Sequence, residues 1–443
     1  MPPPTSLFLL PSTPRRAQRK RGGRGSKQEK KHEKKRYTKK EQFHPLRRKS
    51  LLLLGLHFLF LILFFFFFSF GKERGSMSRL CSRPGGVEVA FQTILPPPPR
   101  QLAGRGGEII LAHGLLGSGR SWQTAARRLL QHPTLSSILH AAHAIDFRNH
   151  GSSPHHLSHA NAAIASDLER FLLRPQGEET KGKRGVLIGH SMGGYAVMGM
   201  LLRRCNAEAI WRDREGDLGG WGASQREICA REMRAVNEAC GFAPEDPLRG
   251  VLFDEKKTTT RGRLAACVVV DITPTTPLST APGADQGVFK ILQAMTRVEL
   301  GAIRSYDDAQ HELQRVGIEE KSMRDFITTN IVLNRGENGG AASWRCNLST
   351  LVSCYEEISP DIVRWFDPNA MNGIAPKPCT LPMLFVFGEK SQFNDPEQRR
   401  QLKRFFPNVR EVVVEGAGHF VHYEKMDAFV EATAPFIAEH LKD

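Results

Sequence analysis

The stretch GVLIGHSMGGYAVM at residues 185–198 predicts a buried strand that runs directly into a helix. Its apolar residues 186–188 indicate the strand, and the helix follows from about residue 192, so Ser191 falls at the turn between them. The turn is so tight that a side chain two residues before or after the serine would clash, which explains Gly189 and Gly193. This G-x-S-x-G pattern holds a hydroxyl at a helix start, where free amides favour developing negative charge.

A lone G-x-S-x-G also occurs in ordinary glycine-rich turns, so the remaining chemistry has to be found elsewhere in the chain. Acyl transfer from a serine needs amide donors for an oxyanion and a histidine base. The sequence HGLLGS at 113–118 follows a short apolar strand, and the amides of Leu115 and Met192 are the candidate oxyanion donors. His419, in GAGHF at 416–420, is the candidate general base, because imidazole titrates near neutral pH.

The net charge of +16 in 443 residues would ordinarily suggest nucleic acid or an anionic membrane as a partner. Residues 1–50 alone carry a net +14, however, so the remainder of the chain is close to neutral. The basic clusters lack a regular interleaving of aromatic residues for base stacking, and we expect no nucleic-acid partner. The eight cysteines show neither a C-x-x-C pair nor zinc-like spacing, which favours buried thiols in a reducing compartment.

Three N-terminal segments precede the domain. Residues 1–50 are a basic, low-complexity tail that we expect to be disordered, residues 51–70 are an almost wholly apolar block, and residues 71–86 are a linker. The apolar block is long enough to cross a bilayer, and the excess of Lys and Arg before it fits a single-pass membrane anchor. An organelle-targeting segment, and a working protein that begins at Met77 without residues 1–76, are the alternatives that stay open.

Residues 87–443 read as one domain of alternating strands and helices, which indicates an α/β fold with a doubly wound, mostly parallel sheet. The strands are expected at residues 87–91, 108–112, 144–146, 186–188, 266–271, 383–387 and 411–414. Residues 206–264 are too long for an ordinary connection, and we expect a surface insertion or a retained non-coding segment there. Residues 275–380 carry helical apolar faces and are expected to form a helical cap inserted between late strands, over the serine.

Three histidines follow the third of these strands. His155, His156 and His159 lie close together, but no carboxylate or cysteine stands at ligand spacing beside them. We therefore expect a solvated loop and no metal site. No motif in the chain implies a cofactor.

Five blocks stand in order along the chain: HGLLGS at 113–118, DFRNHGSSP at 146–154, GHSMGG at 189–194, VDITP at 270–274 and GAGHFVH at 416–422. Together they resemble the α/β-hydrolase superfamily, and more closely its branch of bacterial short-chain acyl esterases, mitochondrial abhydrolase-domain proteins and yeast ethanol acetyltransferases. The resemblance covers most of residues 86–205 and 265–443. It implies the α/β-hydrolase fold, with Ser191 as nucleophile and His419 as base, and it suggests a mitochondrial location.

The expected acid of the triad departs from the commonest pattern of that superfamily. After the strand at 383–387, most members carry an aspartate where this chain has Ser391. A neutral hydroxyl can orient a histidine but cannot stabilise its charged form. Asp271 can supply that carboxylate, and the resemblance to the acetyltransferases implies the aspartate of this block. Asp271 is therefore the expected acid and Ser391 an auxiliary partner, with Asp395 and Glu389 as fallbacks.

The expected activity is hydrolysis of short- or medium-chain acyl esters or thioesters, as small-molecule substrates, through an acyl-enzyme on a Ser-His-Asp triad. One alternative keeps this intermediate but passes the acyl group to an alcohol, which would form acetyl esters. A second alternative is a non-catalytic member of the fold that binds an acylated ligand or a partner protein. The oligomeric state stays open, and membrane attachment depends on residues 51–70.

Overall fold

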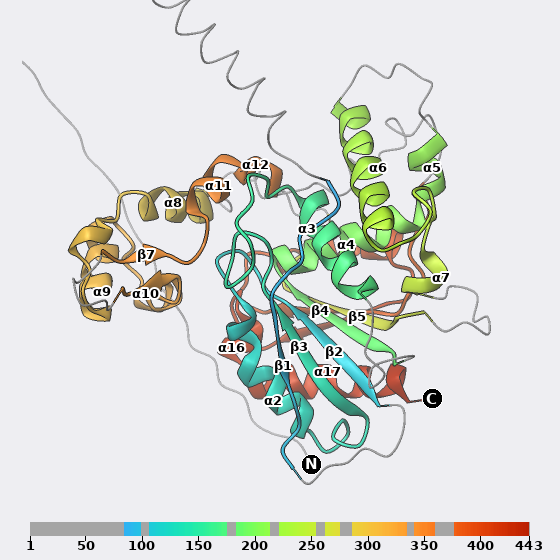
Figure 1. The fold of residues 1–443 in the computed structure, drawn as a ribbon. Helices are drawn as coiled ribbons and strands as arrows, with labels where there is room; N and C mark the ends of the chain where they lie inside the picture. Colours follow the sequence, from blue (N-terminus) through green and yellow to red (C-terminus); the bar gives the residue numbers. More distant parts are fainter. Residues whose placement is uncertain are drawn as a thin grey trace, which may run out of the picture. The chain divides into compact units, whose positions relative to one another are not determined.

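A mostly parallel sheet forms the centre of the domain. The structure is a computed structural model that describes residues 84–98, 106–174, 183–212, 221–253, 262–274, 286–334, 341–358 and 376–442. Within these ranges, seven strands pair in the order β1-β3-β2-β4-β5-β8-β9 (Figure 1). The edge strand β1 runs antiparallel to β3, and every other pair in this sheet is parallel. The strands are β1 (Phe91–Ile94), β2 (Gly107–Ala112), β3 (Leu139–Ile145), β4 (Gly185–His190), β5 (Leu264–Val270), β8 (Met383–Gly388) and β9 (Val409–Val414).

Helices cover both faces of the sheet, because successive side chains of a strand point to opposite faces and both sets are apolar. On one face, α3 (Asn161–Leu173) and α4 (Met192–Cys205) pack on side chains that include Ile110, Leu187 and Val269. On the other face, α2 (Gln123–Gln131) and α17 (Met426–Leu441) pack on Val186 and Val268, among others. Figure 1 shows this sandwich of helix, sheet and helix. The doubly wound α/β prediction is confirmed.

The long segment between β5 and β8 is helical where it is described. It contains α8 (Gln286–Met295), α9 (Tyr306–Arg315), α10 (Lys321–Thr328), α11 (Leu348–Ser353) and α12 (Tyr355–Ile358), with the short hairpin β6 (Ile331–Val332) and β7 (Ser343–Trp344) and the 3₁₀ turn η2 (Leu300–Ala302). In Figure 1 these elements form a gold and orange group beside the sheet. We call them the cap. The predicted helical insertion between late strands is confirmed.

The polar segment at 206–264 also forms helices: α5 (Ala207–Arg212), α6 (Trp221–Ala239) and α7 (Arg249–Leu252). The helix α6 lies against α3, and its Cys229 and Met233 are buried in the core shared with α3 and α4. The remaining short elements are η1 (Gly119–Trp122), α14 (Pro396–Arg400), α15 (Leu402–Phe405) and α16 (Val421–Glu424).

The first strand begins later than the sequence pattern predicts. The alternation at 87–91 predicts a strand, but the strand covers Phe91–Ile94. The amide of Val87 donates instead to the Asp167 carboxylate over 2.7 Å, and the amide of Ala90 donates to Ser153 Oγ over 2.8 Å. Side chains from other elements therefore take two of the amide donors that strand pairing would use, and residues 87–90 are not part of β1.

The apolar block at 51–70, which was predicted as a membrane anchor, lies outside the described residues, as does the tail at 1–50. Among the helices of the described part, none is long and apolar enough to cross a membrane.

Candidate active site

Ser191 lies at the sharp turn between β4 and α4, as predicted. Its φ of 51° is in the left-handed region, which a residue with a side chain rarely adopts. The neighbouring backbone leaves no room for side chains: a Cβ on Gly189 would lie 2.5 Å from the carbonyl oxygen of Gly193, and a Cβ on Gly193 would lie 2.5 Å from that of Ala112. The amide of Ser191 donates to the Val270 carbonyl over 3.0 Å, which fixes the turn to β5.

His419 and Asp271 meet although 148 residues separate them in sequence. His419 Nδ1 lies 2.7 Å from Asp271 Oδ2, and the carboxylate is completely buried whereas the imidazole is partly exposed. The other carboxylate oxygen, Oδ1, accepts a hydrogen bond of 2.9 Å from the amide of Gly388. With Nδ1 donating to the carboxylate, Nε2 is the unprotonated nitrogen of the ring, which is the tautomer that a general base needs.

His190, which precedes Ser191 in the chain, links the serine turn to His419. His190 Nε2 donates to the carbonyl oxygen of His419 over 2.9 Å, and the two imidazole centroids are 4.7 Å apart. The hydrogen bonds of the described residues include none between Ser191 Oγ and His419. Contacts of this kind are often long before a substrate binds.

The other candidate acids make different contacts. Ser391 Oγ donates to Asp271 Oδ2, so it supports the carboxylate rather than the histidine ring. Asp395 accepts the amide of Glu397 over 2.7 Å and caps α14. Glu389 accepts the amide of Gly416 over 2.8 Å. Of the predicted acids, Asp271 is the one whose carboxylate forms a hydrogen bond with His419.

The loop HGLLGS passes close to the serine. A Cβ on Gly114 would lie 2.8 Å from His190 Nδ1 and 3.2 Å from the Cβ of Ser191, so a side chain here would force these neighbours to move. The carbonyl of Gly114 accepts hydrogen bonds from the amide of Gly117, over 2.9 Å, and from His113 Nδ1, over 2.7 Å. The N–H of Leu115 belongs to the same trans peptide and therefore points away from these donors. Within the described part of the chain it has no hydrogen-bond partner, and Met192 begins α4, where amides lack intrahelical partners.

Several histidines around the turn are buried and electrically neutral. Burial lowers the pKa of His113 to about 4 and that of His150 to about 3, because desolvation disfavours the imidazolium. His159 is fully buried, and its Nε2 lies 3.3 Å from Met192 Sδ. The prediction of a solvated loop is therefore wrong for His159, whose ring packs beneath the serine turn, but fits the exposed His155. The described residues hold no group of metal-ligating side chains.

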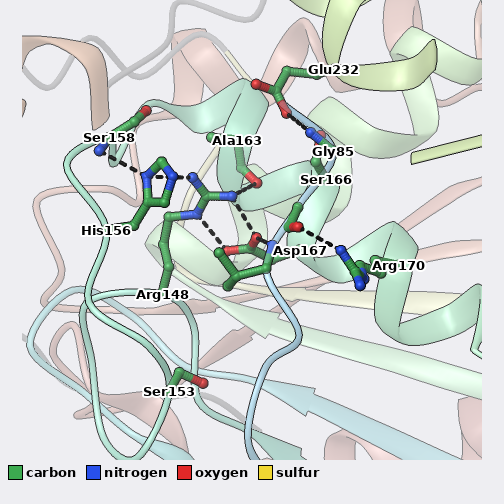
Figure 2. A network of polar contacts seen from close by, with 12 residues as sticks. Gly85, Arg148, Ser153, His156, Ser158, Ala163, Ser166, Asp167, Arg170 and Glu232 are labelled. Atoms are coloured by element: carbon green, nitrogen blue, oxygen red, sulfur yellow. Dashed lines mark hydrogen bonds and ion pairs between the residues drawn. The ribbon is translucent and has the colours of Figure 1, made fainter. Parts of the chain in front are cut away.

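An arginine that the sequence analysis left without a role anchors the loop at 146–154. The Arg148 guanidinium donates to both carboxylate oxygens of Asp167 on α3, over 2.8 and 2.6 Å, and to the carbonyl of Ala163 (Figure 2). In the same network the amide of Gly85 donates to Glu232 of α6. The network thus ties the start of the described chain and the helix α6 to the loop beside the active site. Its acceptors come from distant elements, which sequence spacing does not show.

The chain is similar to a known protein family over most of its length. A sequence model described as "Alpha/beta hydrolase family" matches residues 109–432, which is most of the chain. The chain belongs to the α/β-hydrolase family. A marine microorganism esterase of known structure superimposes with a TM-score of 0.52 at 22% identity, covering 79% of this chain and 99% of the esterase, which shows the shared α/β-hydrolase fold.

The curated relatives fall in the predicted branch. The sn-1-specific diacylglycerol lipase ABHD11 of Mus musculus is 28% identical over 81% of this chain and 90% of its own length. The esterase YbfF of Escherichia coli is 26% identical over 74% and 92%, and a probable alcohol acetyltransferase of Saccharomyces cerevisiae is 22% identical over 75% and 77%. This α/β-hydrolase is therefore an enzyme of the ester-cleaving class.

Proposed function

We propose that this α/β-hydrolase cleaves short- or medium-chain acyl esters or thioesters through a covalent acyl-enzyme on Ser191. The observation that carries the proposal is the hydrogen bond of 2.7 Å between His419 Nδ1 and the buried Asp271, beside a serine held at a strained turn. A buried carboxylate that accepts a hydrogen bond from Nδ1 of an imidazole favours the tautomer with an unprotonated Nε2. This nitrogen can then remove the proton of a hydroxyl.

In the first half of the reaction, His419 Nε2 takes the proton of Ser191 as Oγ attacks the acyl carbon. The amides of Leu115 and Met192 donate to the oxyanion of the tetrahedral intermediate, at the start of α4 where the helix dipole favours negative charge. The intermediate collapses, the bond to the leaving oxygen or sulfur breaks, and His419 returns the proton to that atom.

In the second half, His419 takes a proton from water, and the resulting hydroxide attacks the acyl-enzyme. The free acid leaves, and Ser191 recovers its proton. Asp271 stabilises the imidazolium in both halves, while Ser391 and the amide of Gly388 hold the carboxylate in place.

A second candidate function is alcohol acyl transfer, which the similarity to a probable yeast alcohol acetyltransferase favours. An alcohol would replace water in the second half, and an ester would leave instead of the acid. A cap that excludes water would shift the balance toward transfer. The remaining candidate, a non-catalytic fold member that binds an acylated ligand, would show no covalent intermediate.

We further propose, from the resemblance, a mitochondrial location. Fractionation of cells that express the full chain would test it, and co-sedimentation with a non-mitochondrial membrane would contradict it.

The test of the function is turnover of nitrophenyl esters of graded acyl length by wild type and Ser191→Ala, with and without ethanol. We expect wild-type turnover that the substitution abolishes, with free acid as the product. Ethyl ester formed in the presence of ethanol would make transfer the leading function. A folded wild-type protein without turnover above Ser191→Ala on any ester would refute both, and it would favour the binding protein.

A further inference from the structure

Leu116, in the loop beside Ser191, has a backbone conformation that its own side chain disfavours. Its φ is 60°, and the residue is buried. Leucine rarely adopts this left-handed region, since its Cβ comes too close to the backbone there. Surrounding contacts must therefore hold Leu116 in place, and with it the peptide of Leu115 next to it.

Two buried side chains hold Leu116 from opposite sides. Its amide donates to His150 Nε2 over 3.1 Å, and its carbonyl oxygen accepts from Asn330 Nδ2 over 2.7 Å. His150 is a suitable acceptor because its Nδ1 donates to the carbonyl of Arg148 over 3.0 Å, which leaves Nε2 unprotonated. Burial lowers the pKa of His150 to about 3, so the ring stays an acceptor at neutral pH.

Asn330 belongs to the cap. It lies between α10 and β6, 214 residues from Leu116, and it is 2% exposed. Its own backbone is fixed on both sides, because its amide donates to Ile327 over 2.9 Å and its carbonyl accepts from Arg345 over 2.6 Å. The side chain is therefore rigidly mounted on the cap and reaches the loop that carries Leu115.

We propose that Asn330 is a positioning residue that aligns the Leu115 amide as an oxyanion donor when the cap is docked on the sheet. This inference rests on the proposed function. By holding the carbonyl of Leu116, the cap would keep the loop in place so that the Leu115 amide can donate to the oxyanion. The cap therefore contributes to the chemical step itself.

The test compares Asn330→Asp with wild type in the full chain. Aspartate keeps the shape of the side chain but has no Nδ2 donor for the Leu116 carbonyl. Since misplacement by about 1 Å can cost on the order of 100-fold, we expect kcat to fall by about 10- to 100-fold while KM changes little. The affinity for a trifluoromethyl ketone, whose adduct carries the oxyanion, should fall by the same factor. Inhibition by the carboxylate product should not change.

The matched control is Asn347→Asp. Asn347 also joins the cap to the sheet domain, since its Nδ2 donates to Asn149 Oδ1 over 3.1 Å, but this contact is not with Leu116. Aspartate keeps its role as the N-cap of α11. Like Asn330→Asp, this variant loses a hydrogen bond between the cap and the sheet domain, but we expect no selective loss of ketone affinity.

Three outcomes decide the inference. If wild type and Asn330→Asp turn over esters equally well, the positioning role of Asn330 is refuted, but the proposed function stays intact. If Asn330→Asp loses affinity for the ketone and for the carboxylate product equally, the role of Asn330 is merely structural, and the positioning role is refuted as well. A wild type without turnover and without ketone binding would refute the proposed function and this inference together. If the thermal midpoint shows that Asn330→Asp is unfolded, Asn330→Ser, whose shorter side chain cannot reach Leu116, replaces it.

Discussion

Replacing Asp271 by asparagine tests the acid of the triad with little change to the fold. Asp271 has a φ of 56°, and asparagine is among the residues that tolerate this left-handed region best. The amide of Gly388 donates to Oδ1 over 2.9 Å, so the new amide oxygen is fixed at that position. The NH₂ group then takes the place of Oδ2 and faces His419 Nδ1.

The expected magnitude follows from this orientation. An NH₂ group donates to Nδ1, so His419 must carry its proton on Nε2 and can no longer take one from Ser191. The same change in serine proteases costs about 10⁴-fold in kcat. We expect a loss of about 10³- to 10⁴-fold, which corresponds to roughly 4 to 5.5 kcal/mol in the barrier. KM should stay close to the wild-type value, because Asp271 is buried behind the histidine.

The assay is steady-state hydrolysis of the best nitrophenyl ester, with the thermal midpoint as a check of folding. Asp395→Asn is the matched control: asparagine caps a helix as well as aspartate, so α14 should persist and activity should stay within about twofold. Ser391→Ala should lose about tenfold, as one hydrogen bond to a carboxylate is removed. A folded Asp271→Asn that keeps activity within tenfold of wild type would refute Asp271 as the acid of the triad. A large loss of activity in Asp395→Asn would then identify Asp395 as the acid.

Three further substitutions test other parts of the structure. His422 is stacked on Trp122, and burial lowers its pKa to about 3, so the unfolded chain takes up a proton first as pH falls below about 6.5. Because the ring is held neutral in the folded state, it lowers the unfolding free energy of the wild type by about 2 kcal/mol between pH 7 and pH 5. Phenylalanine does not titrate, so His422→Phe should lack this part of the pH dependence, which urea unfolding at the two pH values measures. Glu169→Gln removes the carboxylate that pairs with the buried Arg203 and Arg204. This substitution should lower the unfolding free energy by about 3 to 5 kcal/mol. Gly193→Ala places a Cβ 2.5 Å from the Ala112 carbonyl oxygen and should abolish activity or folding.

Each of the three has a control or a contradicting result. An equal pH dependence of wild type and His422→Phe would show that this ring is not held neutral. Glu397→Gln, which breaks an exposed pair with Arg400, should leave the unfolding free energy nearly unchanged. Gly250→Ala introduces a Cβ with no atom within 4 Å and should keep full activity. A stable and active Gly193→Ala would contradict the packing of the serine turn.

The residues that local chemistry dictates were predictable from the sequence. Gly189 and Gly193 have to flank Ser191 in any turn of this sharpness, and His419 follows a strand and a glycine turn, so short patterns are sufficient to find them. The alternating strands likewise indicate the sheet, because both faces of each strand are apolar. These features depend on neighbours a few residues away.

The parts that sequence reasoning missed depend on distant partners. The burial of His159 follows from its contact with Met192, and the late start of β1 follows from the Asp167 carboxylate that binds Val87. Asn330 meets Leu116 across 214 residues of chain, and nothing in its local sequence marks it. The segment at 206–264 looks like a polar insertion because charged residues and glycines surround the few apolar residues of α6 that reach the core.

The central claim, a covalent acyl-enzyme on Ser191, is tested most directly by intact-protein and peptide mass spectrometry after brief exposure to a nitrophenyl ester or a fluorophosphonate. The account predicts one adduct of the expected mass on the peptide that contains Ser191, and no adduct in Ser191→Ala. An unmodified wild-type protein, or an adduct on another residue that persists in Ser191→Ala, would contradict it.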